Sequence, residues 1–290
     1  METILEVKSV GRSYPGFDLK DISFSLPRGF IMGLIGPNGA GKTTIIKLIM
    51  NLLRKNNGEI RVFGLDHIKN EVEIKSRIGF VYDTPTFYEH LNLLQMKAII
   101  APFYKTWDDG KFKSLLRNFD LPPRKKIKTL SRGMKMKFAL ALALSHEAEL
   151  IIMDEPTSGL DPVFRRELLD ILHGLIENEQ KSVLFSTHIT SDLDRVADFI
   201  TFINRGELVF SDSKEQILES YGVIRAGKNK ISMSGGLARH VRGYRESEFG
   251  IEILTNDLAA SKDILIEGVV AERASLEDII FLTGKGLKEK

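Results

Sequence analysis

Hydrophobic residues follow three patterns in the N-terminal part of the chain. They alternate with polar residues over 4–10 and 22–26, which is the period of strands with one buried face. Residues 30–35 are almost continuously apolar, which is typical of a strand buried on both faces in a parallel sheet. Residues 43–53 have apolar positions at helical spacing. The buried strand and the helix together predict half of a βαβ unit.

Farther along the chain, helical patterns come first and alternating strands and helices follow. Three segments have helical periodicity: residues 91–104, 109–119 and 134–145. Three apolar segments then predict strands, separated by two helices: strands over 150–153, 182–186 and 199–204, helices over 163–178 and 191–197. Alternating strands and helices predict an α/β fold with a mainly parallel sheet. The helical stretch of about 85–149 is then an insertion into this fold.

The alternation is weaker after residue 211. The patterns there predict a short helix, two strands and a final helix, over 213–221, 251–254, 264–270 and 275–282. We therefore divide the chain into a main domain over 1–215 and a small α+β accessory domain over 216–290. No motif in the second part carries recognisable chemistry.

Composition excludes several kinds of site. The chain has 290 residues, no cysteine and a formal net charge of +2. The lack of cysteine excludes a disulfide framework, a Cys-ligated zinc, an iron–sulfur cluster and a thiol nucleophile. The small charge gives no electrostatic reason to expect nucleic acid or lipid as a partner. There is no secretory signal, and the apolar runs are far shorter than the roughly 20 residues that cross a bilayer. We therefore expect a cytoplasmic protein.

A glycine-rich segment links the buried strand to the helix and carries the pattern G-x-x-x-x-G-K-[ST]: Gly36-Pro37-Asn38-Gly39-Ala40-Gly41-Lys42-Thr43. Glycines allow successive backbone N–H groups to point at phosphate oxygens, and the helix N-terminus favours anions at the same place. Lys42 neutralises phosphate charge, and the Thr43 hydroxyl can ligate Mg²⁺. The strand before the loop and the helix after it argue against a chance glycine turn. We expect the nucleotide-binding residues to be Asn38, Gly39, Gly41, Lys42, Thr43 and Thr44.

An acidic pair follows the buried strand at 150–153. Asp154 comes at the carboxyl end of this strand, where parallel sheets place their ligand sites. An aspartate there can hold Mg²⁺, directly or through water. The adjacent Glu155 can polarise the water that attacks the γ-phosphate. An isolated Asp-Glu pair is usually an exposed loop, but here it accompanies an intact phosphate loop.

Three further short sequences narrow the class. They are Leu130-Ser131-Arg132-Gly133-Met134, Ser158-Gly159-Leu160-Asp161 and Ser186-Thr187-His188. In order and spacing they resemble the ATP-binding subunit of ABC transporters across residues 1 to about 215. The resemblance implies a P-loop ATPase core with an antiparallel β part at its N-terminus. It also implies that the helical insertion carries the family's signature sequence.

The resemblance implies further site residues. Tyr14 matches an aromatic residue that stacks on adenine. Ser131 and Gly133 match the signature that contacts the γ-phosphate held by another subunit, and Asp161 matches an aspartate that links the two sites. His188 matches the residue that senses the γ-phosphate and positions the attacking water. Two such domains would close head to tail around two ATP molecules.

The sequence departs from the family pattern at three positions. Arg132 and Met134 replace the usual first glycine and the glutamine of the signature. The usual serine and second glycine remain, as Ser131 and Gly133. Asp83 stands where most members have a metal-contacting glutamine. An acidic residue there resembles the branch that serves exporters of the bacitracin-resistance and lantibiotic-immunity kind. Aspartate is shorter than glutamine and charged, which changes both its metal contact and its coupling to a membrane partner.

The resemblance favours one function over two alternatives. It implies an ATPase using ATP and Mg²⁺ that pairs with a second ATPase subunit, in a homodimer or heterodimer, and drives a separate transmembrane permease. The permease would contact the region around 83–104 and hold the chain at the inner face of the cell membrane. The resemblance to the exporter branch favours export as the direction of transport. The alternative is a soluble ABC-class ATPase acting on nucleic acid or the ribosome. One phosphate loop, no sustained heptads and a basic run over 124–128 without aromatic residues argue against it. A regulatory role for the tail is a third possibility.

Overall fold

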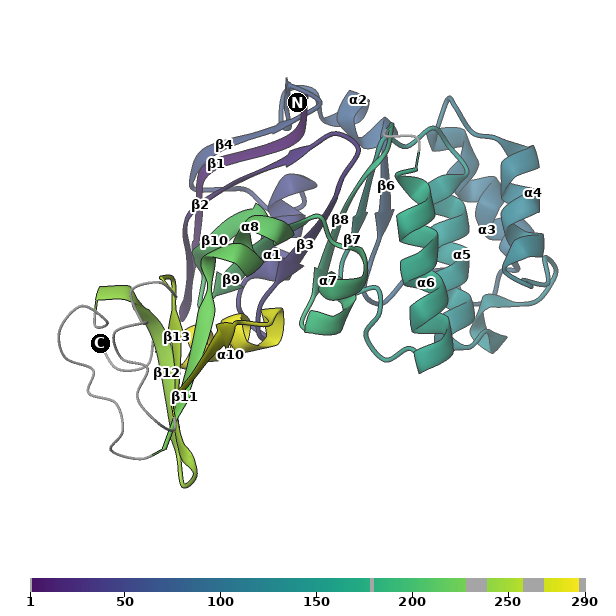
Figure 1. The fold of residues 1–290 in the computed structure, drawn as a ribbon. Coiled ribbons are helices and arrows are strands. Elements are labelled where there is room, and N and C mark those ends of the chain that lie inside the picture. The colour runs from purple at the N-terminus through teal and green to yellow at the C-terminus, as the bar shows by residue number, and fades with distance from the viewer. Residues whose placement is uncertain (1, 178–179, 228–238, 258–268, 287–290) are drawn as a thin grey trace. The chain divides into compact units, whose positions relative to one another are not determined.

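The computed structural model describes residues 2–177, 180–227, 239–257 and 269–286 (Figure 1). The chain divides into two compact units, Met1–Ser211 and Asp212–Lys290. No helix among the described residues is long and apolar enough to cross a membrane. The assignment of 1–215 to the ATPase and 216–290 to an accessory domain stays a prediction about what the two parts do.

The described part of the first unit contains one large sheet, in the order β5-β4-β1-β2-β10-β9-β3-β8-β7-β6. Its strands are β1 (Thr3–Tyr14), β2 (Phe17–Pro27), β3 (Ile31–Ile35), β4 (Asn57–Val62), β5 (Leu65–Asp66), β6 (Ile78–Val81), β7 (Leu150–Met153), β8 (Ser182–Thr187), β9 (Phe199–Asn204) and β10 (Glu207–Ser213). β1 pairs antiparallel with β2 and β4. β3 pairs in parallel with β8 and β9, and β7 with β6 and β8. The predicted α/β class, with a parallel core and an antiparallel N-terminal part, is confirmed.

Helices connect these strands and form the inserted segment. They are α1 (Lys42–Ile49), α2 (Glu71–Ser76), α3 (Leu93–Ile100), α4 (Asp109–Asn118), α5 (Arg132–Leu144), α6 (Pro162–Leu175) and α7 (Thr190–Val196), with 3₁₀ turns at Ala101–Phe103 and Ile127–Thr129. The predicted helix over 43–53 is too long, because α1 ends before Asn51, which has a positive φ of 50°. The helix predicted over 91–104 is also too long. Its α-helical part ends at Ile100, just before the 3₁₀ turn that contains Pro102.

β3 is covered on both faces, as its continuous apolar sequence predicts. Met32 and Leu34 belong to the core that also contains Ile46 and Ile49 of α1. On the other face, a Cβ added to Gly33 would overlap the Leu193 side chain of α7. α1 thus packs on one side of the parallel sheet and α7 on the other. This arrangement leaves the carboxyl end of β3 open to the phosphate loop.

The second unit contains a smaller antiparallel sheet, in the order β12-β13-β11-β14 among the described residues. Its elements are α8 (Lys214–Ser220), β11 (Gly222–Ala226), β12 (Val241–Ser247), β13 (Gly250–Thr255), β14 (Val269–Arg273) and α10 (Leu276–Gly286). α10 packs against β12 and β13. The predicted α+β character is confirmed, although β11 and β12 were not predicted. Of the strand predicted over 264–270, residues 264–268 lie outside the described part.

Two glycines give a test of how closely α5 must pack on the sheet. A Cβ on Gly79 of β6 would lie 2.7 Å from the Ala143 carbonyl oxygen of α5. Gly79→Ala is therefore expected to lower the free energy of unfolding by about 1–3 kcal/mol through overpacking. Gly174→Ala, on an exposed face of α6 with no atom nearer than 4.0 Å, should instead raise it by about 0.5–1 kcal/mol. Urea unfolding midpoints at equal m-values measure both changes; equal effects of the two variants would contradict the close contact.

Candidate active site

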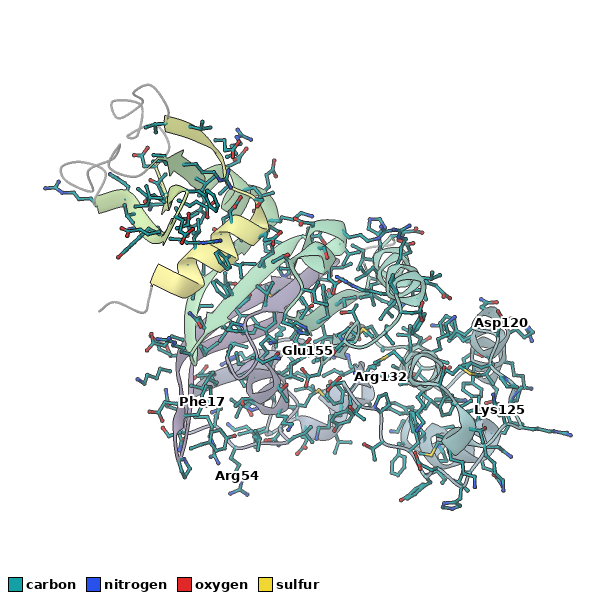
Figure 2. All side chains as sticks on the ribbon, turned by 90° about the horizontal axis from the view of Figure 1, so that it is seen from below. Phe17, Arg54, Asp120, Lys125, Arg132 and Glu155 are labelled. Atoms are coloured by element: carbon teal, nitrogen blue, oxygen red, sulfur yellow. The ribbon has the colours of Figure 1, made fainter. Side chains whose placement is uncertain are left out.

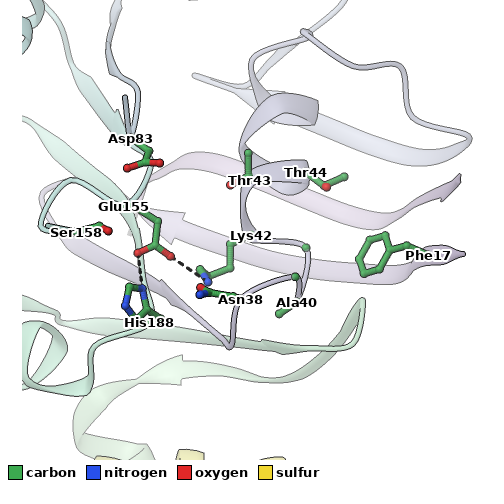
Figure 3. Close-up of a pocket in the computed structure, with 12 residues that line it drawn as sticks. Phe17, Asn38, Ala40, Lys42, Thr43, Thr44, Asp83, Glu155, Ser158 and His188 are labelled. Atoms are coloured by element: carbon green, nitrogen blue, oxygen red, sulfur yellow. Dashed lines mark hydrogen bonds and ion pairs between the residues drawn. The ribbon is translucent and has the colours of Figure 1, made fainter. Parts of the chain in front are cut away.

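Three loops meet because the parallel strands before them end at the same edge of the sheet. Ile35 of β3 lies opposite Thr187 of β8, and Met153 of β7 lies opposite Phe185. The residues after these strand ends surround a pocket of 610 Å³ (Figure 3). The pocket is lined by Phe17, Asn38, Gly39, Ala40, Gly41, Lys42, Thr43, Thr44, Asp83, Glu155, Ser158 and His188. The loops predicted for nucleotide and catalysis are thus brought together.

The phosphate loop depends on glycine in two ways. Gly39 and Gly41 have φ of 79° and 112°, a region that side chains with a Cβ rarely adopt. At Gly36 an added Cβ would clash with the Ile203 carbonyl oxygen, so only glycine allows this close approach of two backbones. The loop ends in Lys42, which is 5% exposed and donates through Nζ to the Gly36 carbonyl oxygen at 2.7 Å. The loop thus positions a buried ammonium group at the pocket wall.

Asp154 lies behind the pocket and is 6% exposed. Its Oδ1 accepts hydrogen bonds from Thr43 Oγ1 at 3.1 Å and from Ser186 Oγ at 2.7 Å. Two hydroxyl donors hold the carboxylate next to the first turn of α1. A threonine hydroxyl and an aspartate carboxylate are hard oxygen ligands of the kind that Mg²⁺ prefers, and it completes its shell with waters and phosphates. The described residues contain no cluster of three or more His, Cys, Asp or Glu that could hold a metal ion.

The Glu155 carboxylate contacts two basic side chains of the pocket. Its Oε1 lies 3.0 Å from Lys42 Nζ, and its Oε2 lies 2.8 Å from His188 Nδ1 (Figure 3). Its backbone has a positive φ of 47°, an uncommon conformation for a residue with a side chain. Its N–H donates to Ser186 Oγ at 2.8 Å, which holds this turn in place. A carboxylate in this position can accept a proton from water.

Two residues that sequence reasoning did not single out have clear positions. Ser186 bridges Asp154 and the Glu155 backbone through one hydroxyl. It belongs to the Ser-Thr-His sequence already noted, and a buried serine one strand away from an acidic pair is the signal that could have indicated it. Phe17 lines the pocket, and its ring lies 3.1 Å from where a Cβ of Gly41 would be.

Tyr14 is not among the residues that line the pocket. It pairs with Phe17 across the turn between β1 and β2, and Arg12 lies 4.9 Å from the centre of its ring. The two aromatic residues therefore flank one turn beside the phosphate loop, with Phe17 on the side that faces the loop. The sequence could indicate an aromatic residue near this turn but not which of the two faces the pocket.

The signature residues and Asp161 also lie outside the pocket, at the first turns of two neighbouring helices. Ser131 is the N-cap of α5 and accepts from Met134 N–H at 3.2 Å. Asp161 is the N-cap of α6 and accepts from Phe164 N–H at 3.0 Å. A Cβ on Gly133 would lie 3.2 Å from the Phe164 ring. The first turns of α5 and α6 thus lie side by side, with Ser131 and Asp161 exposed.

Comparison with known proteins identifies the class. The family model described as ABC transporter matches residues 19–158. An uncharacterised ABC transporter ATP-binding protein of Bacillus subtilis is 34% identical over 66% of this chain and 62% of its own length, so the match spans less than two thirds of that relative. The bacitracin transport ATP-binding protein of Bacillus licheniformis is 32% identical over 72% of this chain and 69% of its own. A lantibiotic transport ATP-binding protein of Streptococcus pyogenes is 30% identical over 75% and 96%.

A solved structure described as the ATP-binding subunit of an ABC transporter gives a TM-score of 0.66 at 30% identity. The comparison covers 74% of this chain and 91% of that one. The chain therefore belongs to the family of ABC transporter ATP-binding subunits and is an ATPase of that class. The predicted similarity to the bacitracin and lantibiotic transport type is confirmed by the relatives found.

Two buried serines of β8 separate a role in the site from a role in the fold. Ser186 and Ser182 are both 0% exposed, and each accepts from a backbone N–H, Ser182 from Gly29 at 2.9 Å. Each change to alanine leaves one N–H unpaired and should cost about 1–3 kcal/mol of stability. Only Ser186→Ala also loosens the Glu155 turn, so we expect its kcat for ATP to fall at least about tenfold. Steady-state ATPase assays and urea unfolding measure both; an equal kcat loss in Ser182→Ala would contradict this prediction.

Proposed function

We propose that this chain hydrolyses Mg²⁺-ATP in the pocket described and couples hydrolysis to a transmembrane permease. The observation that carries the proposal is the position of the Glu155 carboxylate between Lys42, at the end of the phosphate loop, and His188 (Figure 3). Acid–base chemistry needs such a carboxylate within reach of a water that attacks the γ-phosphate.

The residues have separate tasks in this proposal. Asn38, Gly39, Gly41 and Thr44 hold the phosphates together with Lys42, which exchanges Glu155 for a phosphate oxygen when nucleotide binds. Glu155 is then free to accept the proton of the attacking water, and His188 orients that water.

A metal ion would be held by hydroxyl and carboxylate oxygens next to the first turn of α1. Thr43 and Asp154 would ligate Mg²⁺, with Asp83 facing the same pocket. The ion supplies charge neutralisation on the phosphate oxygens. Ser186 keeps Asp154 oriented through its hydroxyl.

The adenine would stack on an aromatic ring beside the turn between β1 and β2. The resemblance assigns this task to Tyr14, and the pocket lining favours Phe17. Offset stacking on either ring would bury the face of the base and fix its orientation without distinguishing strongly between bases.

A second ATPase subunit completes the site in this proposal. Ser131, Gly133 and Asp161 belong to two adjacent helix starts outside this subunit's own pocket. They are therefore available to contact nucleotide on another subunit, in a homodimer or heterodimer. Closure would place each signature turn against the other subunit's ATP.

A permease would contact the helical segment. A cavity of 180 Å³ there is lined mainly by apolar and aromatic side chains, among them Tyr82, Phe87, Met96 and Ile100. Tyr82 is 44% exposed, and Phe103 beside the cavity-lining Tyr104 is 78% exposed. Exposed apolar side chains around a hollow mark an interaction surface. Contact with a permease would hold the chain at the inner face of the cell membrane, and the resemblance at Asp83 favours export.

Glu155→Gln is the direct test of the catalytic assignment. The amide keeps the size of the side chain but cannot accept the proton, so we expect kcat to fall by about 10²–10⁴-fold. ATP binding should remain, and an ATP-bound dimer should accumulate. Phosphate release, equilibrium nucleotide binding and sedimentation of the variant measure the three properties. Unchanged hydrolysis would remove Glu155 from the catalytic role.

The permease surface is tested by adding a charge to the cavity. Ile100→Glu would place an unpaired carboxylate at the contact and should reduce recovery of a multi-spanning membrane protein from gently solubilised membranes by at least about tenfold. ATPase activity of the isolated subunit should not change. Val72→Glu, at an apolar residue of α2 that is 85% exposed, is the matched control and should not affect recovery. Recovery with ribosomes or DNA instead would favour the alternative function.

A further inference from the structure

An ion pair connects the signature turn with the nucleotide pocket of the same chain. Arg132 Nη2 lies 3.0 Å from Asp83 Oδ1, although the two residues are 49 positions apart. Arg132 follows the N-cap of α5, and Asp83 follows β6 and lines the pocket. Figure 2 shows Arg132 in the same part of the molecule as Glu155, whereas Asp120 and Lys125 lie farther along the helical segment.

Arg132 also contacts the loop after β7. Gly159 has a φ of 64°, and a Cβ there would lie 2.5 Å from Arg132 Nη1. The guanidinium group therefore packs on the Gly159 backbone while it bonds to Asp83. Arg132 bridges the segment after β6 and the segment that follows Glu155.

The two partners are two of the positions at which this sequence departs from the family pattern. By the resemblance, a glycine is expected in place of Arg132 and a glutamine in place of Asp83, and a glycine has no side chain with which to form this contact. Here a positive and a negative side chain replace them and meet. Each departure thus has the other as its electrostatic partner.

The pair is weak enough to exchange its partners. Both side chains are 47% exposed, so solvent screens the attraction between them, and a single hydrogen bond, from Nη2 to Oδ1, joins them. A guanidinium group can bind phosphate oxygens through two parallel, charge-assisted hydrogen bonds, which hold it more firmly than one. A phosphate in reach of Arg132 would therefore displace Asp83.

Nucleotide in the pocket would act on the other partner. The Asp83 carboxylate faces the pocket that also contains Lys42 and Thr43. A metal ion on phosphates in this pocket would attract the carboxylate and compete with Arg132 for it. This competition would weaken the hold of Asp83 on Arg132.

We propose that Asp83 and Arg132 form an exchangeable ion pair that links this subunit's nucleotide pocket to its signature turn. Nucleotide in the pocket loosens Asp83, and Arg132 then binds phosphate oxygens of the ATP held by the second subunit. This inference rests on the head-to-tail dimer of the proposed function. Arg132 would thus be a phosphate-binding residue that acts in trans, and Asp83 the residue that holds it until its own pocket is filled.

The first experiment measures the Kd of the ATP-dependent dimer in the Glu155→Gln background by sedimentation. Adding Arg132→Ala should weaken the dimer by roughly 10- to 100-fold, and Arg132→Lys should weaken it less. Arg124→Ala removes an exposed arginine of the basic run before α5 and should leave the dimer unchanged. At protein concentrations below dimerisation, Arg132→Ala should bind ATP as tightly as its parent. Weaker binding there would show a contact with the subunit's own nucleotide and overturn the action in trans.

The second experiment follows the ion pair itself in the full chain. The ¹⁵Nε signal of Arg132, assigned by its loss in Arg132→Lys, should shift when Mg²⁺-ATP is added at monomeric concentration. The shift should be towards the position that the signal has in Asp83→Ala. A signal that does not move would overturn the link to Asp83.

The two levels of the argument fail differently. If Glu155→Gln alone forms no ATP-dependent dimer, the proposed dimer is wrong, and the inference about Arg132 is overturned with it. If that dimer forms and Arg132→Ala forms it equally tightly, only the inference is overturned. A weaker dimer together with unchanged ATP binding by the monomer supports both.

Discussion

The parallel pairing of β3, β8 and β7 is the constraint on which the rest of the site depends. Because Ile35 and Thr187 are partners in register, the phosphate loop and His188 begin at the same level of the sheet. β7 ends beside them at Met153, so Asp154 and Glu155 come at the same edge of the sheet. Strand register alone therefore brings together residues from three distant parts of the sequence.

Charge in the site is arranged in pairs whose cations can bind phosphate. Lys42 lies 3.0 Å from a Glu155 oxygen, and Arg132 lies 3.0 Å from an Asp83 oxygen. In both pairs the cation also lies against the backbone of a glycine, Gly36 for Lys42 and Gly159 for Arg132. The pairs differ in exposure: the Lys42 side chain is 6% exposed and the Arg132 side chain 47%. The first is thus an internal pair of the pocket, and the second a surface pair between segments, which is easier to exchange.

Much of the fold follows from local pattern, and the errors have local causes. β7 and β9 have the predicted bounds, since each is a short, mainly apolar segment between charged residues, Glu149 and Asp154 around β7 and Asp198 and Arg205 around β9. β4 was not predicted because it begins with Asn57 and Gly58, a pair typical of turns, and the alternation beyond them extends over only two buried residues. The helix predicted over 134–145 begins too late, because Ser131 caps α5 and Arg132 already belongs to it.

The phosphate loop, the acidic pair after β7 and the order of motifs could be read from the sequence alone, because these depend on residue types at short, fixed spacing. The existence of α5 could be read in the same way, since its apolar period is a local signal, although its first turn contains signature residues. Two facts required the folded structure: Phe17 rather than Tyr14 lines the pocket, and Arg132 forms an ion pair with Asp83. Those facts depend on side-chain directions and on strand register across tens of residues, which local pattern does not contain.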